Sequence, residues 1–130
     1  MHHFIEHTGE VEFVIESSSE AGVFEEALKA LAELMDREEG GEPTQHVIDV
    51  AAADRASLLV EWLTELLFLA EVERFVPERM ATSELVGGRL LATVEGRRGQ
   101  PSHLVKAVTL NSLEFEEENG AWHGRVVLDV

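Results

Sequence analysis

The stretch DRASLLVEWLTELLFLA, residues 54–70, carries the strongest structural signal in this sequence. Asp54 is a favoured N-cap residue, because its carboxylate accepts hydrogen bonds from free backbone N–H groups of the first helical turn. Apolar side chains follow at helical spacing, at Leu58, Leu59, Trp62, Leu63, Leu66, Leu67, Leu69 and Ala70. So wide a stripe predicts a helix buried in the core, although a partner protein could also cover such a face.

A second helix is predicted earlier in the chain. Ser17 and Glu20 have the spacing of a capping box, with Ser18 or Ser19 as alternative caps. A narrower apolar stripe then runs through Phe24, Ala27, Leu28, Leu31, Leu34 and Met35. Gly40 and Gly41 favour its end, because glycine adopts the left-handed conformation that terminates many helices.

The other segments have the alternation or the turn signals of β-strands. Asn119-Gly120 and Gly87-Gly88 each separate two extended runs and predict two-residue hairpins. Strands are expected at 4–6, 11–16, 44–52, 105–116 and 121–129 and around Gly87-Gly88, with Val11, Phe13 and Ile15 buried and Glu12 and Glu16 facing outward. We therefore expect one α+β domain over residues 1–130, two-layered, with two helices packed on a mixed or antiparallel β-sheet.

The net charge of the chain distinguishes among the possible classes of function. The chain of 130 residues has 26 acidic and 10 basic residues, a net charge of −16. Direct nucleic-acid binding is not expected, because it needs a basic surface. A basic partner or a hard cation would suit this surface, although solubility or adaptation to salt also accounts for it.

There is no cysteine, which excludes disulfides, thiolate metal sites and cysteine nucleophiles. No membrane-spanning run or signal peptide is found, so a cytoplasmic location is expected.

Motifs of the common nucleotide-binding, metalloprotease and serine-hydrolase sites are absent, and the six histidines are scattered. Glu10 stands at the start of one predicted strand, and Asp129 and Val130 at the end of the last. If these strands are neighbours, two side-chain carboxylates and the carboxylate of Val130 meet, and such oxygen clusters bind Ca²⁺ or Mg²⁺. The alternative is that these charges are simply solvated. Lys106, in an otherwise apolar strand, is either a lysine at a strand edge, a counter-charge near these carboxylates or a contact to a partner.

Five segments in the same order resemble the archease family and span nearly the whole chain. They are Glu6-His7-Thr8-Gly9-Glu10-Val11, VEWLTELLFL at 60–69, Lys106-Ala107-Val108-Thr109, Gly120-Ala121-Trp122 and Val127-Leu128-Asp129-Val130. The resemblance implies an archease-like fold and a non-catalytic protein cofactor. Its implied partner is the GTP-dependent tRNA-splicing RNA ligase of the RtcB type, whose guanylylation and multiple turnover it would promote.

The resemblance also implies site residues. Glu10, Asp129 and Val130 correspond to the divalent-cation site of the family, and His7, Thr8, Lys106 and Thr109 are expected to be partner-binding or otherwise functional positions. Glu10 stands where the family usually has aspartate, and its extra methylene favours the flexible coordination of Ca²⁺ over the rigid geometry of Mg²⁺.

Other departures leave further functions open. Leu110-Asn111 replaces the usual Tyr-His pair, and the loop at 97–102 is shorter than usual. One alternative is a chaperone-like modulator of RNA-processing enzymes, such as a tRNA methyltransferase. Another is a metal-dependent hydrolase that uses His7 and Glu10, although no set of nucleophile, base and orienting group is visible.

Overall fold

The computed structural model describes residues 1–35, 41–100, 105 and 107–130. Its elements are β1 (His2–His7), β2 (Glu10–Ser17), α1 (Glu20–Met35), β3 (Pro43–Ala51), α2 (Arg55–Val72), β4 (Phe75–Val86), β5 (Arg89–Arg98), β6 (Ala107–Glu118) and β7 (Ala121–Asp129). The predicted α+β class, with two helices among antiparallel strands, is confirmed. No described helix is long and apolar enough to cross a membrane.

The strands form two sheets rather than the single sheet predicted from the sequence. A four-stranded sheet with the order β1-β2-β7-β6 contains both ends of the chain and is called the terminal sheet here. A three-stranded sheet with the order β3-β5-β4 is called the middle sheet. All described strand pairs are antiparallel.

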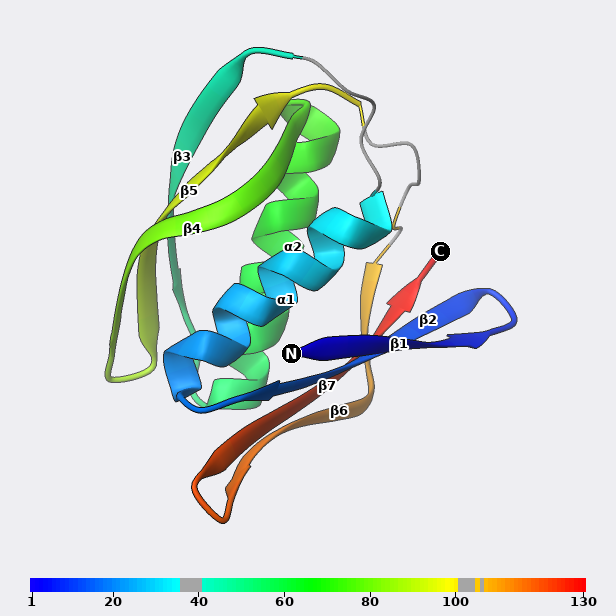
Figure 1. Cartoon of the computed structure of the whole chain (residues 1–130), viewed down its shortest axis with the longest axis vertical. Helices are drawn as coiled ribbons and strands as arrows, with labels where there is room; N and C mark the ends of the chain where they lie inside the picture. Colours follow the sequence, from blue (N-terminus) through cyan, green and yellow to red (C-terminus); the bar gives the residue numbers. More distant parts are fainter. Residues whose placement is uncertain (36–40, 101–104, 106) are drawn as a thin grey trace.

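The two helices lie between these sheets, which makes three layers instead of two (Figure 1). Helix α1 packs against β2 of one sheet and β4 of the other, and α2 packs against β6 and against β3 and β4. The wide apolar stripe of α2 explains the division, because such a helix must be covered on more than one side. Trp62 is fully buried there, and its indole N–H donates to the carbonyl oxygen of Phe24 at 3.0 Å.

Local signals locate the helix starts and the hairpins. The Asp54 carboxylate accepts a hydrogen bond from the Ser57 N–H at 2.8 Å, as predicted for the N-cap of α2. In α1 the cap is Ser19, whose hydroxyl accepts from the Gly22 N–H at 3.0 Å, so the capping box of Ser17 and Glu20 is not formed. The predicted end of α1 falls partly outside the described residues, since Gly40 is not among them.

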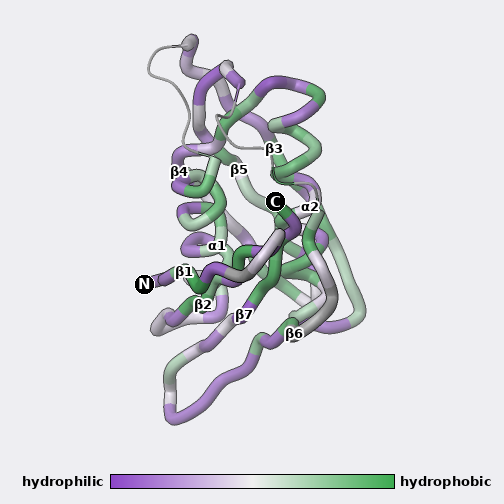
Figure 2. The backbone as a smooth tube through the Cα atoms, turned by 90° about the vertical axis from the view of Figure 1, so that its right-hand side faces the viewer, coloured by the Kyte–Doolittle hydropathy of each residue, from purple (hydrophilic) through white to green (hydrophobic). Residues whose placement is uncertain are grey.

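Both predicted two-residue hairpins are confirmed. Gly87 and Gly88 have φ of 56° and 77°, and Asn119 and Gly120 have φ of 54° and 80°. Two consecutive positive φ values define the type I′ turn, whose twist matches that of the strands it joins. The second hairpin joins β6 to β7, and hydrophilic residues follow it to its tip (Figure 2).

Candidate functional site

Glu10 and Asp129 lie directly opposite each other in the terminal sheet, where β2 pairs with β7. At the next position the Val130 N–H donates to the Gly9 carbonyl oxygen at 3.2 Å. Because hydrogen-bonded and non-hydrogen-bonded pairs alternate in an antiparallel ladder, Glu10 and Asp129 form a non-hydrogen-bonded pair. In such a pair the Cα atoms are only about 4.5 Å apart and both side chains leave the same face. The structure thus meets the condition of the sequence-based prediction, because the strands that carry Glu10 and Asp129 are neighbours.

The turn between β1 and β2 extends this arrangement into a row across the sheet. Gly9 has a φ of 74°, which a residue with a side chain rarely adopts, and the turn returns the chain so that His7 pairs with Glu10. On the other side Asp129 pairs with Ala107 of β6. The backbone of four strands therefore places His7, Glu10, Asp129 and Ala107 in one row at the end of the sheet.

The remaining predicted site residues divide into those near this row and one that is not described. Thr8 is exposed in the turn beside Gly9. Thr109 pairs with Val127, two residues along β6 from the row, and so shares its face. Lys106 lies outside the described residues, although it directly precedes Ala107 in the sequence.

The carboxylate oxygens at this row are donors of the type that a hard cation prefers, but few side chains supply them. Within residues 1–35, 41–100, 105 and 107–130, no three histidine, aspartate or glutamate side chains are grouped to hold a metal ion. Glu10 and Asp129 supply two carboxylates, and the third predicted donor is the carboxylate of Val130, the residue after Asp129. Oxygen donors of this kind are the ligands of Ca²⁺ and Mg²⁺. The cation site remains a prediction.

A buried charge that the sequence pattern does not predict lies next to this row. Glu12 was expected to face outward from β2, yet it is only 7% exposed, and its cross-strand neighbour Val127 is also buried. Arg125, the one basic residue on the strands of this sheet, lies 3.8 Å from carboxylate oxygens of both Glu12 and Glu114. The available signal was the isolated arginine on the same face of the last strand as Asp129.

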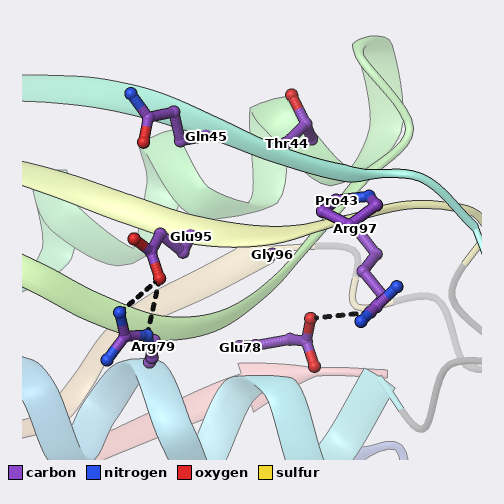
Figure 3. A pocket seen from close by; sticks show the side chains of 8 residues that line it. All are labelled: Pro43, Thr44, Gln45, Glu78, Arg79, Glu95, Gly96 and Arg97. Atoms are coloured by element: carbon purple, nitrogen blue, oxygen red, sulfur yellow. Dashed lines mark hydrogen bonds and ion pairs between the residues drawn. The ribbon is translucent and has the colours of Figure 1, made fainter.

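A groove lies elsewhere, on the middle sheet (Figure 3). It measures about 590 Å³ and is lined by Pro43, Thr44, Gln45, Glu78, Arg79, Glu95, Gly96 and Arg97. Figure 3 shows its charges in pairs: Arg79 donates to Glu95 at 2.6 Å, and Arg97 lies 3.2 Å from Glu78. None of the predicted site residues lines this groove, so the candidate site is the acidic end of the terminal sheet.

These features define a small α+β protein with two helices between two antiparallel sheets and a pair of carboxylates at the end of one sheet. A sequence profile of the archease protein family (MTH1598/TM1083) matches residues 2–130. The chain belongs to the archease family.

Individual relatives agree with this assignment. Protein archease of Methanosarcina mazei is 33% identical over 137 aligned positions, which cover 98% of this chain and 94% of the relative. The solution structure of Methanobacterium thermoautotrophicum protein 1598 superposes with a TM-score of 0.75 at 26% identity, covering 99% and 98% of the two chains. The crystal structure of "an archease, possible chaperone" from Thermotoga maritima has a TM-score of 0.72 at 21% identity, covering 97% and 94%, and supports the fold.

Proposed function

We propose that this protein is a non-catalytic activator of a GTP-dependent RNA ligase of the RtcB type, and that it promotes guanylylation of the ligase and its multiple turnover in tRNA splicing. Membership of the archease family supports this role. The structural observation that carries it is the pairing of Glu10 with Asp129 at the acidic end of the terminal sheet.

The docking we propose is electrostatic and transient. A ligase that binds RNA presents a basic cleft, and the acidic end of the terminal sheet complements it in charge. Such complementarity chiefly raises the rate of association, and salt weakens it. In this proposal the residues expected to be partner-binding or functional positions make the contacts around the acidic row; they are His7, Thr8, Lys106 and Thr109.

The proposal includes a divalent cation, with Ca²⁺ favoured over Mg²⁺. Glu10, Asp129 and the Val130 carboxylate would hold it, and the bound cation would supply positive charge where these carboxylates otherwise repel one another. Ca²⁺ accepts irregular oxygen shells, which suits the longer side chain of Glu10.

The first test measures guanylylation of a cognate ligase with substoichiometric amounts of this protein. We expect acceleration that decreases as salt increases, and a loss of about tenfold or more in Asp129→Asn, a size typical when a metal site is damaged. The matched control is Asp49→Asn, which removes a carboxylate from the middle sheet and should leave acceleration unchanged. Equal acceleration by wild type and Asp129→Asn would contradict the role of the acidic row.

The second test separates cation binding from ligase activation. Added Ca²⁺ should raise the melting temperature of the wild-type protein, because a ligand bound only by the folded state stabilises it by about 2.7 kcal/mol at a concentration 100 times its Kd. Asp129→Asn and a chain extended beyond Val130 should lose most of this shift, whereas Asp49→Asn should keep it. Equal shifts in all four proteins would mean that the cation binds elsewhere.

A chaperone-like role for RNA-processing enzymes, such as a tRNA methyltransferase, is the second candidate. The Thermotoga maritima protein of the same fold is described as a possible chaperone, and a net charge of −16 would suit the shielding of a basic client. Suppression of client aggregation without any effect on ligase guanylylation would favour this candidate over the first.

A further inference from the structure

The two sheets have four edge strands, and three of them carry features that discourage pairing with another strand. β1 has only six residues, and β6 has a register shift between Thr109 and Glu114. β4 has two register shifts and a proline, Pro77. Short edge strands, bulges and proline all disfavour strand addition. β3 differs, since it pairs with β5 through nine consecutive residues without a shift, and its one proline, Pro43, is only its first residue.

The hydrogen-bond pattern shows which backbone groups of β3 face the open edge. The Ala52 N–H donates to the Gly88 carbonyl, and the Glu42 carbonyl accepts from the Arg98 N–H. Both bonds point toward β5, and the direction alternates along an antiparallel strand. The odd-numbered residues from Pro43 to Ala51 therefore direct their backbone groups away from β5. Among the described residues, no hydrogen bond to these groups from another element is found. Pro43 has no N–H to leave unpaired at this edge.

Charge and exposure also make this edge accessible to a second copy. Val47, at the centre of β3, is 67% exposed, and Asp49 is held by two hydrogen bonds from Arg89 at 2.7 and 2.5 Å. The strands of the middle sheet carry four acidic and four basic residues, in a chain with a net charge of −16. Two copies that approach through this sheet thus avoid the like-charge repulsion of the acidic strands.

We propose that two copies of this chain associate through β3, antiparallel and with Val47 on the two-fold axis. Each Val47 then exchanges both backbone hydrogen bonds with Val47 of the other copy, Gln45 lies opposite Asp49, and Pro43 lies opposite Ala51. The two middle sheets become one continuous six-stranded sheet. This assembly does not depend on the ligase proposal, because it uses the opposite sheet.

Self-complementarity selects this register among the antiparallel ones that the backbone pattern allows. A two-fold axis at Asp49 would place two carboxylates directly opposite each other, which is unfavourable. An axis at Gln45 would leave Asp49 and Ala51 without partners on β3 of the other copy. The axis at Val47 uses all five outward-facing residues and brings the Gln45 side-chain amide near the Asp49 carboxylate.

Sedimentation over a hundred-fold range of concentration tests the association. The wild-type mass should rise from 14.4 kDa toward twice that value. Val47→Lys should weaken association by about tenfold or more, because two like charges would face each other at the axis. Val86→Lys is the matched control, since Val86 is 66% exposed and lies on β4, the opposite edge strand of the same sheet. It should associate like the wild type.

Cross-linking tests the register in a chain that has no cysteine of its own. Under oxidation Val47→Cys should form a disulfide-linked dimer much faster than Val86→Cys, because residues paired across the axis have Cα atoms about 5.5 Å apart. A wild-type protein that stays monomeric throughout, or equal cross-linking of the two variants, would overturn the proposal. Monomers that instead bind an extended peptide at Val47 would overturn it in favour of a different partner.

Discussion

The strands of the terminal sheet carry nine acidic residues and one basic residue, whereas those of the middle sheet carry four of each. In the middle sheet Arg79, Arg89 and Arg97 each contact a carboxylate, of Glu95, Asp49 and Glu78 respectively. In the terminal sheet Arg125 is shared between two carboxylates at 3.8 Å. The net charge of the chain is thus concentrated unevenly. The acidic sheet is the one to which we assign the cation and the basic partner, and the balanced sheet is the one to which we assign the second copy.

The largest expected effect comes from replacing a buried glycine. Each sheet contains one on its strands, Gly96 in the middle sheet and Gly124 in the terminal sheet. A Cβ atom at Gly96 would collide with the carbonyl oxygen of Val76 and come within 2.8 Å of the Phe75 ring. Backbone cannot yield as a side chain can, so Gly96→Ala should lower the free energy of unfolding by about 3 kcal/mol. Urea denaturation measures this loss.

Gly124 of the terminal sheet is the matched control. An added Cβ there would lie 3.2 Å from a methyl group of Val23, and other neighbours are at 3.7 Å. A small movement of that side chain suffices, and the unfolded chain loses entropy, so Gly124→Ala should change stability by about 1 kcal/mol or less. Equal losses of unfolding free energy in the two variants would contradict the inferred difference in packing around the two glycines.

A smaller effect is expected from the arginines. Arg125→Met would leave the Glu12 carboxylate, only 7% exposed, without its described cation, and should cost about 1–2 kcal/mol of unfolding free energy. Arg89→Met should cost less, because both Arg89 and Asp49 are exposed and water replaces the lost partner. Replacing Glu12 by Gln together with Arg125→Met should recover part of the loss. A larger cost for Arg89→Met would reverse the comparison.

The smallest effect depends on pH and concerns the attachment of β1 to α1. The His2 ring lies 2.9 Å from Glu26 and 2.8 Å from Glu33, both on α1. Burial alone would lower the pKa of His2, but its hydrogen bonds to these two carboxylates outweigh burial and raise the pKa above 6.5. A raised pKa in the folded state means that the stabilisation is complete below about pH 6.5 and is lost as the pH rises through the raised value.

The unfolding free energies of wild type and His2→Gln should therefore differ more at pH 6 than at pH 9, by about 0.5 kcal/mol, since the group is partly exposed. Glu33→Gln should reduce this pH dependence, because it removes one of the two carboxylates. A difference between wild type and His2→Gln that is constant across pH would show that this attachment does not titrate.

Short-range patterns in the sequence were sufficient for the helices and hairpins. Asp54 caps α2 through a residue three positions away, and the two hairpin turns depend only on Gly87-Gly88 and Asn119-Gly120. Alternation in the sequence placed Glu10 and Asp129 at the ends of two strands, and only the pairing of those strands had to be assumed. The two strands do pair in the structure, so the conditional prediction that these residues meet was also correct. The function of that pair was suggested by resemblance and not by the pattern itself.

Only the tertiary structure decided the division into two sheets, the burial of Glu12 and the open edge of β3. Each depends on which distant segments pair, as β2 does with β7, and the alternation of a single strand is compatible with many partners. Glu12 and Glu16 occupy equivalent positions in the pattern of β2, yet Glu12 is buried and Glu16 is exposed. Burial is set by what packs on a face, and that information lies in long-range contacts rather than in local sequence.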